Sequence, residues 1–196
     1  MEKLLFATNN THKLAEVRQI LQERCALISL AEAGVQSNPV EDAPTLEGNA
    51  LIKVRDAHRL SQLPTIADDT GLEVDCLGGA PGVYSARYAG EAHNDAANRQ
   101  KLVEDLCSFS PPYKARFRTV VAYIDAAGAE HLFEGCVEGT IILEERGEAG
   151  FGYDALFVPE GEERTFAQMT EHEKNAMSHR ARTITAFSQY LKQYPL

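Results

Sequence analysis

Two long strand-like segments separated by a short turn constrain the fold of this chain most. Residues 115–125 and 130–142 both have the composition of strands, and Ala126-Ala127-Gly128 joins them. So short a connection makes consecutive strands run antiparallel, and the pair therefore predicts a long β-hairpin. Upstream of it, strand-like and helical segments alternate, which is typical of an α/β fold. The two patterns together predict a mixed sheet.

The first half of the chain alternates between short apolar runs and longer segments with apolar residues every three or four positions. This periodicity predicts strands and helices, and Thr11 and Thr45 stand where helix N-caps are preferred. The predicted elements are a strand over 3–8, a helix over 12–23, a strand over 26–30, a helix from 46 to about 62, and short strands over 64–67 and 72–77.

The second half adds a helix from Asn94 or Asp95 to about residue 107, the hairpin, and a short strand over 156–158. Thr170 and Glu173 form a capping-box pattern that opens a C-terminal helical region. The chain, 1–196, is therefore expected to be a single α/β domain. Its mixed, partly antiparallel elongated sheet would be flanked by helices, and two lobes would enclose a central cleft.

The chain of 196 residues carries a formal net charge of −10, which argues against binding a nucleic acid polymer through a basic face. No apolar run approaches the ~20 residues that span a bilayer. The first residues lead directly into a strand-like run without a secretory signal, and the four cysteines form no closely spaced pair. These features predict a cytoplasmic protein with reduced thiols and no membrane association.

Polar residues that suit phosphate gather where the first strand meets the first helix. Free N–H groups and the helix dipole favour phosphate there, and Asn10 and Lys13 follow Thr8 with an amide donor and a full charge. The alternative is a helix cap with a solvated lysine, because the segment lacks the glycine spacing of a P-loop. Lys53, which shares a helix face with Asn49, can reach a cleft edge or pack its stem on apolar surface.

Two adjacent carboxylates, Asp68 and Asp69, end one of the predicted short strands. Burying both is costly, so one is expected to be solvated or bound to a cation. Neighbouring side chains of an extended chain point to opposite faces, so only one would enter the cleft. A carboxylate there can hold Mg²⁺ or activate water, and Glu41 and Glu47 can complete a hard-cation site. The alternative is an Asp that caps a turn.

The segment Gly150-Phe151-Gly152-Tyr153-Asp154 places glycines on both sides of an aromatic residue. Glycines let a backbone approach a ligand closely. Phe151 or Tyr153 can stack on a base, and Asp154 can accept a hydrogen bond from a ring N–H. The alternative is a glycine-bounded entry into a strand, with both aromatic residues in the core.

Lys174, His179 and Arg180 supply further donors near the C-terminus. On one unbroken helix, His179 would lie about 140° from Lys174, so the two could not face one ligand. A break near Met177, with Ser178 capping the next helix, removes this conflict and predicts two short helices. The alternative is a polar surface on one continuous helix.

These segments, in this order, resemble the motifs of the non-canonical purine nucleoside triphosphate pyrophosphatases, the inosine/xanthosine triphosphatases of the Ham1-like family. The resemblance covers nearly the whole chain. The motifs read Ala7-Thr8-Asn9-Asn10-Thr11-His12-Lys13, Glu47-Gly48-Asn49-Ala50-Leu51-Ile52-Lys53, Ala67-Asp68-Asp69-Thr70-Gly71-Leu72, Pro81-Gly82-Val83-Tyr84-Ser85-Ala86-Arg87, Gly150-Phe151-Gly152-Tyr153-Asp154 and Ser178-His179-Arg180. Departures from the usual pattern are Asn9 and His12 in place of glycine, Thr70 in place of serine, and Ala155 in place of proline.

The resemblance implies a homodimer that cleaves dITP, ITP and XTP to the monophosphate and pyrophosphate with Mg²⁺. It implies that Glu41 and Asp69 bind the metal and that Asp69 is also the catalytic base. The residues implied to bind the triphosphate and sugar are Thr8, Asn10, Lys13, Lys53 and Thr70. Those implied to bind the base are Phe151 by stacking, together with Gly152, Tyr153, Asp154, Lys174, His179 and Arg180. A donor on His179 or Arg180 would match a 6-oxo purine and clash with adenine.

Two other functions remain open from the residues alone. Asp69-Thr70-Gly71 matches the short signature of aspartic proteases, which would require a dimer to supply the second aspartate. Asp68 stands where that signature expects an apolar residue. A sensor that holds a nucleotide without hydrolysing it would use the same polar clusters.

Overall fold

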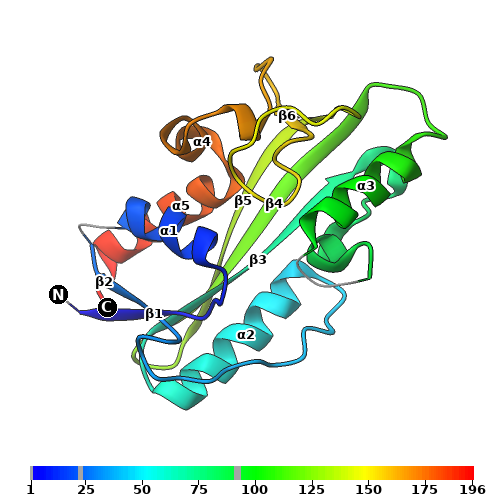
Figure 1. Ribbon diagram of the computed structural model, residues 1–196. Coiled ribbons are helices and arrows are strands. Elements are labelled where there is room, and N and C mark those ends of the chain that lie inside the picture. Colours follow the sequence, from blue (N-terminus) through cyan, green and yellow to red (C-terminus); the bar gives the residue numbers. More distant parts are fainter. Residues whose placement is uncertain (1, 22–23, 91–93) are drawn as a thin grey trace. The chain divides into compact units, whose positions relative to one another are not determined.

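The computed structural model describes residues 2–21, 24–90 and 94–196. It contains a six-stranded sheet with the order β2-β1-β3-β4-β5-β6 (Figure 1). The strands are β1 (Lys3–Phe6), β2 (Ala26–Ser29), β3 (Thr65–Val74), β4 (Tyr113–Ile124), β5 (Glu130–Ile141) and β6 (Phe157–Pro159). β1 pairs in parallel with β2 and β3, whereas β5 pairs antiparallel with β6. The predicted mixed sheet is therefore confirmed, as is the hairpin of β4 and β5.

The helices are α1 (Thr11–Leu21), α2 (Leu46–Ser61), α3 (Asp95–Leu106), α4 (Glu171–Met177) and α5 (His179–Gln193), with short 3₁₀ turns η1 (Asp75–Leu77), η2 (Gly82–Arg87) and η3 (Phe166–Gln168). As predicted, Thr45 caps α2 by accepting a backbone N–H group. Of the two predicted starts of α3, Asp95 is the first helical residue, and Asn94 is its N-cap. Among the described residues, no helix has both the length and the apolar character needed to cross a bilayer.

The cap of α1 lies one residue earlier than predicted. The Oδ1 atom of Asn10 accepts the N–H groups of His12 and Lys13 at 3.0 and 3.1 Å, which is the pattern of an N-cap. Thr11 is therefore the first helical residue and not the cap. The predicted end of this helix, Glu23, lies outside the described residues.

The chain forms two compact units. Unit 1 comprises Met1–Asp69, Thr119–Gly135 and Arg180–Leu196, and unit 2 comprises Thr70–Arg118 and Cys136–His179. β3, β4 and β5 each contribute residues to both units.

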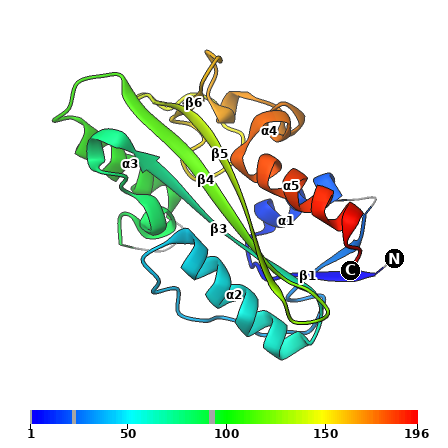
Figure 2. The ribbon, with the colours of Figure 1, turned by 180° about the vertical axis from the view of Figure 1, so that it is seen from behind.

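Unit 1 buries its strands between helices on both faces. Val17 of α1 and Phe187 of α5 pack with Phe6 of β1 in one apolar cluster, and Figures 1 and 2 show α2 on the opposite side of these strands. All residues of β3 from 65 to 69 are accordingly buried. A strand covered on both faces reads as a continuous buried run and shows no alternation.

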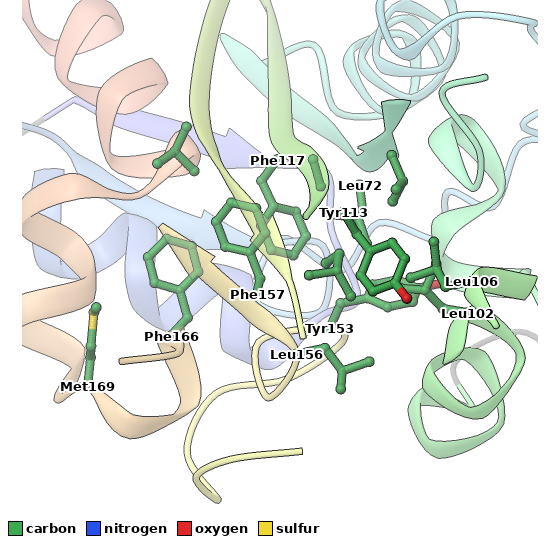
Figure 3. Packing of buried hydrophobic residues seen from close by; sticks show 14 residues of the cluster. Leu72, Leu102, Leu106, Tyr113, Phe117, Tyr153, Leu156, Phe157, Phe166 and Met169 are labelled. Carbon is green, nitrogen blue, oxygen red and sulfur yellow. The ribbon is translucent and has the colours of Figure 1, made fainter. Parts of the chain in front are cut away.

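Unit 2 has an aromatic core. Phe117, Phe157 and Phe166 lie side by side in it (Figure 3), with ring centroids 4.7 Å apart for Phe117 and Phe157. In β4, Tyr113, Ala115 and Phe117 are buried while the residues between them are not. This alternation is expected of a strand that buries one face.

The prediction of two separate short strands over 64–67 and 72–77 was wrong. Asp68-Asp69-Thr70-Gly71 lies inside the single strand β3. Polar residues can remain in this buried strand because both carboxylates form ion pairs. Gly71 permits close approach of another backbone, since a Cβ there would lie 2.7 Å from the carbonyl oxygen of Gly82.

Candidate active site

Asp68 and Asp69 contact different basic residues of unit 1. Asp68 lies 2.9 Å from the Nζ atom of Lys13, and Asp69 lies 2.8 Å from that of Lys53. Lys13 belongs to α1 and Lys53 to α2, as expected if the strand pleat sends adjacent side chains to opposite faces. Both carboxylates are buried, so neither is solvated, and each contacts a cationic side chain.

The pKa of Asp68 lies well below its usual range. Burial alone would raise this pKa, but the positive charges of Lys13 and Arg180 outweigh burial. The pKa of Lys13 is itself lowered, because burial of its ammonium group outweighs the attraction of Asp68. Asp68 is therefore a fixed negative charge that holds the partly buried Lys13 in place.

Asp69 has the opposite shift. Burial raises the pKa of Asp69 by more than Lys53 and Lys13 lower it. The amide of Asn49 also donates to Asp69 at 3.4 Å, and the Oδ1 atom of Asn49 accepts the N–H of Ala43 at 3.0 Å. Adjacent carboxyl groups with pKa values pushed apart can divide the roles of proton acceptor and fixed charge.

Lys53 bridges two carboxylates. Its Nζ atom lies 2.8 Å from Asp69 and 2.9 Å from Glu41. Burial lowers the pKa of Lys53, but the surrounding carboxylates raise it further, so the net shift is upward. Glu41 and Asp69 thus hold a cation between them. Glu47 lies in the first turn of α2, and no group of three or more metal-ligating side chains occurs among the described residues.

The loop before α1 brings the predicted phosphate ligands together. The N–H of Asn10 donates to the hydroxyl oxygen of Thr8 at 3.1 Å, and Asn10 caps the helix with its amide oxygen. The Nδ2 group of Asn10 is the donor end of this side chain. Lys13 follows within the first turn, so the helix N-terminus carries backbone donors, an amide and an ammonium group.

Arg180 lies in unit 1 with the acidic residues. Its Nε atom lies 3.4 Å from Asp68, its Nη1 atom forms a short contact with Glu16, and it is 2% exposed. Sequence reasoning did not identify Glu16, although Glu16 lies three residues after Lys13 and such spacing shares a helix face. The structure therefore groups Arg180 with Asp68, whereas the predicted base-binding loop belongs to unit 2.

Phe151, Asp154 and Lys174 form a connected group in unit 2. Lys174 and Asp154 make a buried ion pair at 2.7 Å. Asp154 also accepts the N–H of Phe151 at 2.9 Å, and the Lys174 ammonium lies 4.8 Å from the centroid of the Phe151 ring. Phe151 is half-buried, so part of this residue stays accessible. The predicted grouping of these three residues is present.

Tyr153 and His179 are core residues of unit 2. The hydroxyl of Tyr153 donates to the carbonyl of Ser85 at 2.8 Å, and burial raises the pKa of Tyr153. The His179 ring stacks on Phe117 with centroids 4.7 Å apart. Because Tyr153 is buried, Phe151 is the more exposed of the two candidate stacking residues.

The two remaining predicted site residues lie in unit 2. Thr70 lies half-buried in β3, and both polar backbone groups of Gly152 contact α3.

The predicted break in the C-terminal helical region is confirmed. α4 ends at Met177, Ser178 is extended with φ −65° and ψ 156°, and α5 begins at His179. The capping box of Thr170 and Glu173 is present at the start of α4. α5 has 15 residues, so only the first of the two helices is short.

The fold is a mixed-sheet α/β fold. Unit 1 holds a lysine–carboxylate cluster, and unit 2 holds an accessible aromatic residue beside a buried Lys–Asp pair. Together these are the groups of a nucleotide-binding enzyme. Comparison with known proteins specifies the class. Residues 4–190 match the model of the Ham1 family, and the chain belongs to this family.

Named relatives match along almost the whole chain. A dITP/XTP pyrophosphatase of Porphyromonas gingivalis is 53% identical over 191 residues, which cover 97% of this chain and 98% of the relative. One from Clostridium perfringens is 41% identical, with 98% of each chain covered. The solved structure of a HAM1 protein from Coxiella burnetii has a TM-score of 0.89 at 37% identity, covering 98% of this chain and 100% of that chain.

Proposed function

We propose that this protein hydrolyses the non-canonical purine nucleoside triphosphates dITP, ITP and XTP to the monophosphate and pyrophosphate. Such an enzyme removes damaged purines from the nucleotide pool. The observation that carries the proposal is Asp69, a buried carboxylate of raised pKa held beside Lys53 and Glu41. Relatives named dITP/XTP pyrophosphatase, at up to 53% identity, support the choice of substrate.

The charges of unit 1 support a cation-dependent reaction. Three cationic side chains (Lys13, Lys53 and Arg180) contact four carboxylates (Glu16, Glu41, Asp68 and Asp69), which leaves one net negative charge when all are ionised. A triphosphate would not approach this group without additional positive charge. A nucleotide that draws Lys53 toward its phosphates would also leave Glu41 and Asp69 in need of another cation.

Glu41 and Asp69 fit Mg²⁺ by their chemistry. They offer carboxylate oxygens, and they already hold the ammonium group of Lys53 at 2.9 and 2.8 Å. Mg²⁺ is typically bound by one or two carboxylates together with substrate phosphates, so a larger protein cage is not required. When bound, the ion would supply positive charge that offsets the developing charge on the phosphates.

Asp69 would act as the general base. A water oxygen would attack the α-phosphorus while Asp69 accepts the water proton, and the bond from the α-phosphorus to the bridging oxygen would break. The electron pair of that bond leaves with pyrophosphate. Lys13 and Lys53 would offset the charge of the leaving group, and the donors of Thr8 and Asn10 would orient the phosphates beside the N-terminus of α1.

The group in unit 2 would recognise the purine. Phe151 would stack on the base, while the Asp154–Lys174 pair offers an acceptor and a donor for the ring edge. Thr70 would contact the sugar and phosphates. We also propose His179 and Arg180 as donors toward the 6-oxo group. To reach it, His179 would have to extend beyond its contact with Phe117, and Arg180 beyond its contacts with Asp68 and Glu16.

Three further features belong to the proposal. We propose that 1–196 act as one domain, because three strands contribute to both units. We propose a homodimer that binds neither nucleic acid polymers nor membranes. A cytoplasmic location agrees with the four free cysteines, since a reducing compartment keeps thiols unpaired.

Neither alternative function draws support. Asp69 lies beside the ammonium group of Lys53, unlike an aspartate that shares a proton with a second aspartate. The comparisons report relatives named as pyrophosphatases, which disfavours a sensor that does not turn over its ligand.

Hydrolysis of dITP with Mg²⁺ in ¹⁸O-labelled water tests the proposed reaction. The expected products are dIMP and pyrophosphate, with the label in dIMP because water attacks the α-phosphorus. Label in pyrophosphate would move the attack to the β-phosphorus. Release of dIDP and phosphate would overturn the proposed reaction.

A further inference from the structure

Two residues of α3 hold the backbone of Gly152 in the aromatic loop of unit 2. Asp95 accepts the N–H of Gly152 at 2.7 Å, and the Nη1 atom of Arg99 donates to the carbonyl of Gly152 at 2.9 Å. Asp95 and Arg99 are four residues apart and therefore share a helix face. The Nε atom of Arg99 also donates to Glu145 at 2.8 Å, which fixes the orientation of the guanidinium group.

The loop needs such support because of its glycines. Gly150 and Gly152 have φ angles of +76° and +60°, a region that glycine enters without steric cost. Glycine also leaves the unfolded and alternative loop conformations more accessible than other residues do. Hydrogen bonds from a helix therefore select one conformation of a segment that its own residues leave adjustable.

The hydrogen bonds surround Phe151. Its N–H donates to Asp154 at 2.9 Å, its carbonyl accepts the N–H of Asp154 at 3.2 Å, and the next N–H is the one that Asp95 accepts. The peptide groups before and after Phe151 are thus anchored. Once these groups are fixed, the ring has only its side-chain torsions left to vary.

We propose that Asp95 and Arg99 are positioning residues that hold Phe151 ready to stack on the purine. The inference rests on the proposed function, in which Phe151 contacts the base. Stacking is present in both the bound substrate and the transition state. Loss of the positioning contacts should therefore raise KM and leave kcat nearly unchanged.

The first test compares Arg99→Met with Asp105→Asn. Asp105 lies on the same helix, where it contacts Lys101 and Tyr88, so its variant reports general damage to α3. We expect Arg99→Met to raise the KM for dITP about tenfold, which is the effect of losing one charge-assisted hydrogen bond. Inhibition by tripolyphosphate, which has no base to stack, should stay unchanged. An equal rise in KM for Asp105→Asn, or a matching loss of tripolyphosphate inhibition, would contradict the proposal.

A double-mutant cycle with Phe151→Leu gives the second test. If Arg99 acts through the ring, adding Arg99→Met to Phe151→Leu should raise KM by less than about twofold. Independent, multiplying effects would show that Arg99 does not act through Phe151. Restoration of KM by Arg99→Lys would support the donor contact. A wild-type protein that fails to release pyrophosphate from dITP would instead overturn the proposed function, so the two failures are distinguishable.

Discussion

Asp68 and Asp69 show how two identical neighbours acquire different properties. The strand pleat directs one toward Lys13 and Arg180 and the other toward Lys53. The charges of Lys13, Arg180 and Lys53 together outweigh burial and lower the pKa of Asp68, whereas burial dominates for Asp69 and raises its pKa. Substitution of the two aspartates should therefore separate a loss of stability from a loss of turnover.

Asp69→Asn should keep its fold and lose turnover by about 10²–10⁴-fold, the usual contribution of a general base. Because the raised pKa means that the ionised carboxylate is disfavoured in the folded protein, the melting temperature should not fall. In the wild-type enzyme, kcat/KM should rise with pH through the pKa of Asp69, above the ordinary aspartate value of about 3.9. Steady-state kinetics across pH and a melting curve measure both effects, and near-normal turnover of the variant would remove Asp69 from this role.

Asp68→Asn should destabilise the fold by about 3–5 kcal/mol, because it leaves the buried charge of Arg180 and the partly buried charge of Lys13 without this partner. The contribution of Asp68 follows from its lowered pKa. It is fully present above the pKa of an unfolded aspartate and is lost as pH falls through the lower folded value. Denaturant unfolding at neutral and acidic pH measures it. A free energy of unfolding equal to that of wild type would contradict the assignment.

Gly150→Ala should be more damaging than Gly152→Ala. A Cβ at Gly150 would lie 2.1 Å from an oxygen of Asp154, whereas a Cβ at Gly152 would meet nothing within 4 Å. The second variant therefore bears only the strain of its positive φ, about 1–2 kcal/mol. The KM for dITP, measured for both variants, should rise more for Gly150→Ala. Equal values would mean that Asp154 shifts without consequence for the loop.

The break between α4 and α5 gives the C-terminal elements their separate tasks. α4 has seven residues, well below the length at which an isolated helix is stable. Its position therefore depends on its capping box and on burial of Lys174 against Asp154. α5 contributes Ile184 and Phe187 to the core of unit 1.

Thr170→Ala should loosen α4 and raise the KM for dITP, because Lys174 lies on this helix. Loss of the cap typically costs about 1 kcal/mol. Thr170→Ser keeps the hydroxyl and is the matched control. Kinetics and melting curves of the pair test the idea, and identical KM values for Thr170→Ala and wild type would show that burial alone holds α4 in place.

Several elements could be predicted from the sequence because local patterns determine them. The structure confirms the predicted N-cap at Thr45, the capping box at Thr170 and the break at Ser178. β3 was not, because carboxylates inside a buried strand depend on basic partners that come from distant helices. Asp95 and Arg99 lie 57 and 53 residues from Gly152 in the sequence, so no local pattern indicates their contacts with it.

The two units divide the recognised motifs between them. Two of the boundaries between the units fall between Asp69 and Thr70 and between His179 and Arg180. The motifs around Asp69 and around His179 therefore each have residues in both units. Apart from Thr70, the residues proposed for phosphate and metal lie in unit 1, and apart from Arg180, those proposed for the base lie in unit 2. We therefore expect selectivity for the base to depend on unit 2, and the metal requirement to depend on unit 1.

The comparison of kcat/KM for dITP, XTP, ATP and GTP, each with Mg²⁺ and with a chelator, tests the central claim most directly. We predict pyrophosphate release from dITP and XTP with Mg²⁺, at values up to about 10⁴-fold above that for ATP because of the mismatched 6-amino group, with GTP also disfavoured. Chelation should abolish the reaction. Equal turnover of ATP and dITP, or turnover that persists after chelation, would contradict the account.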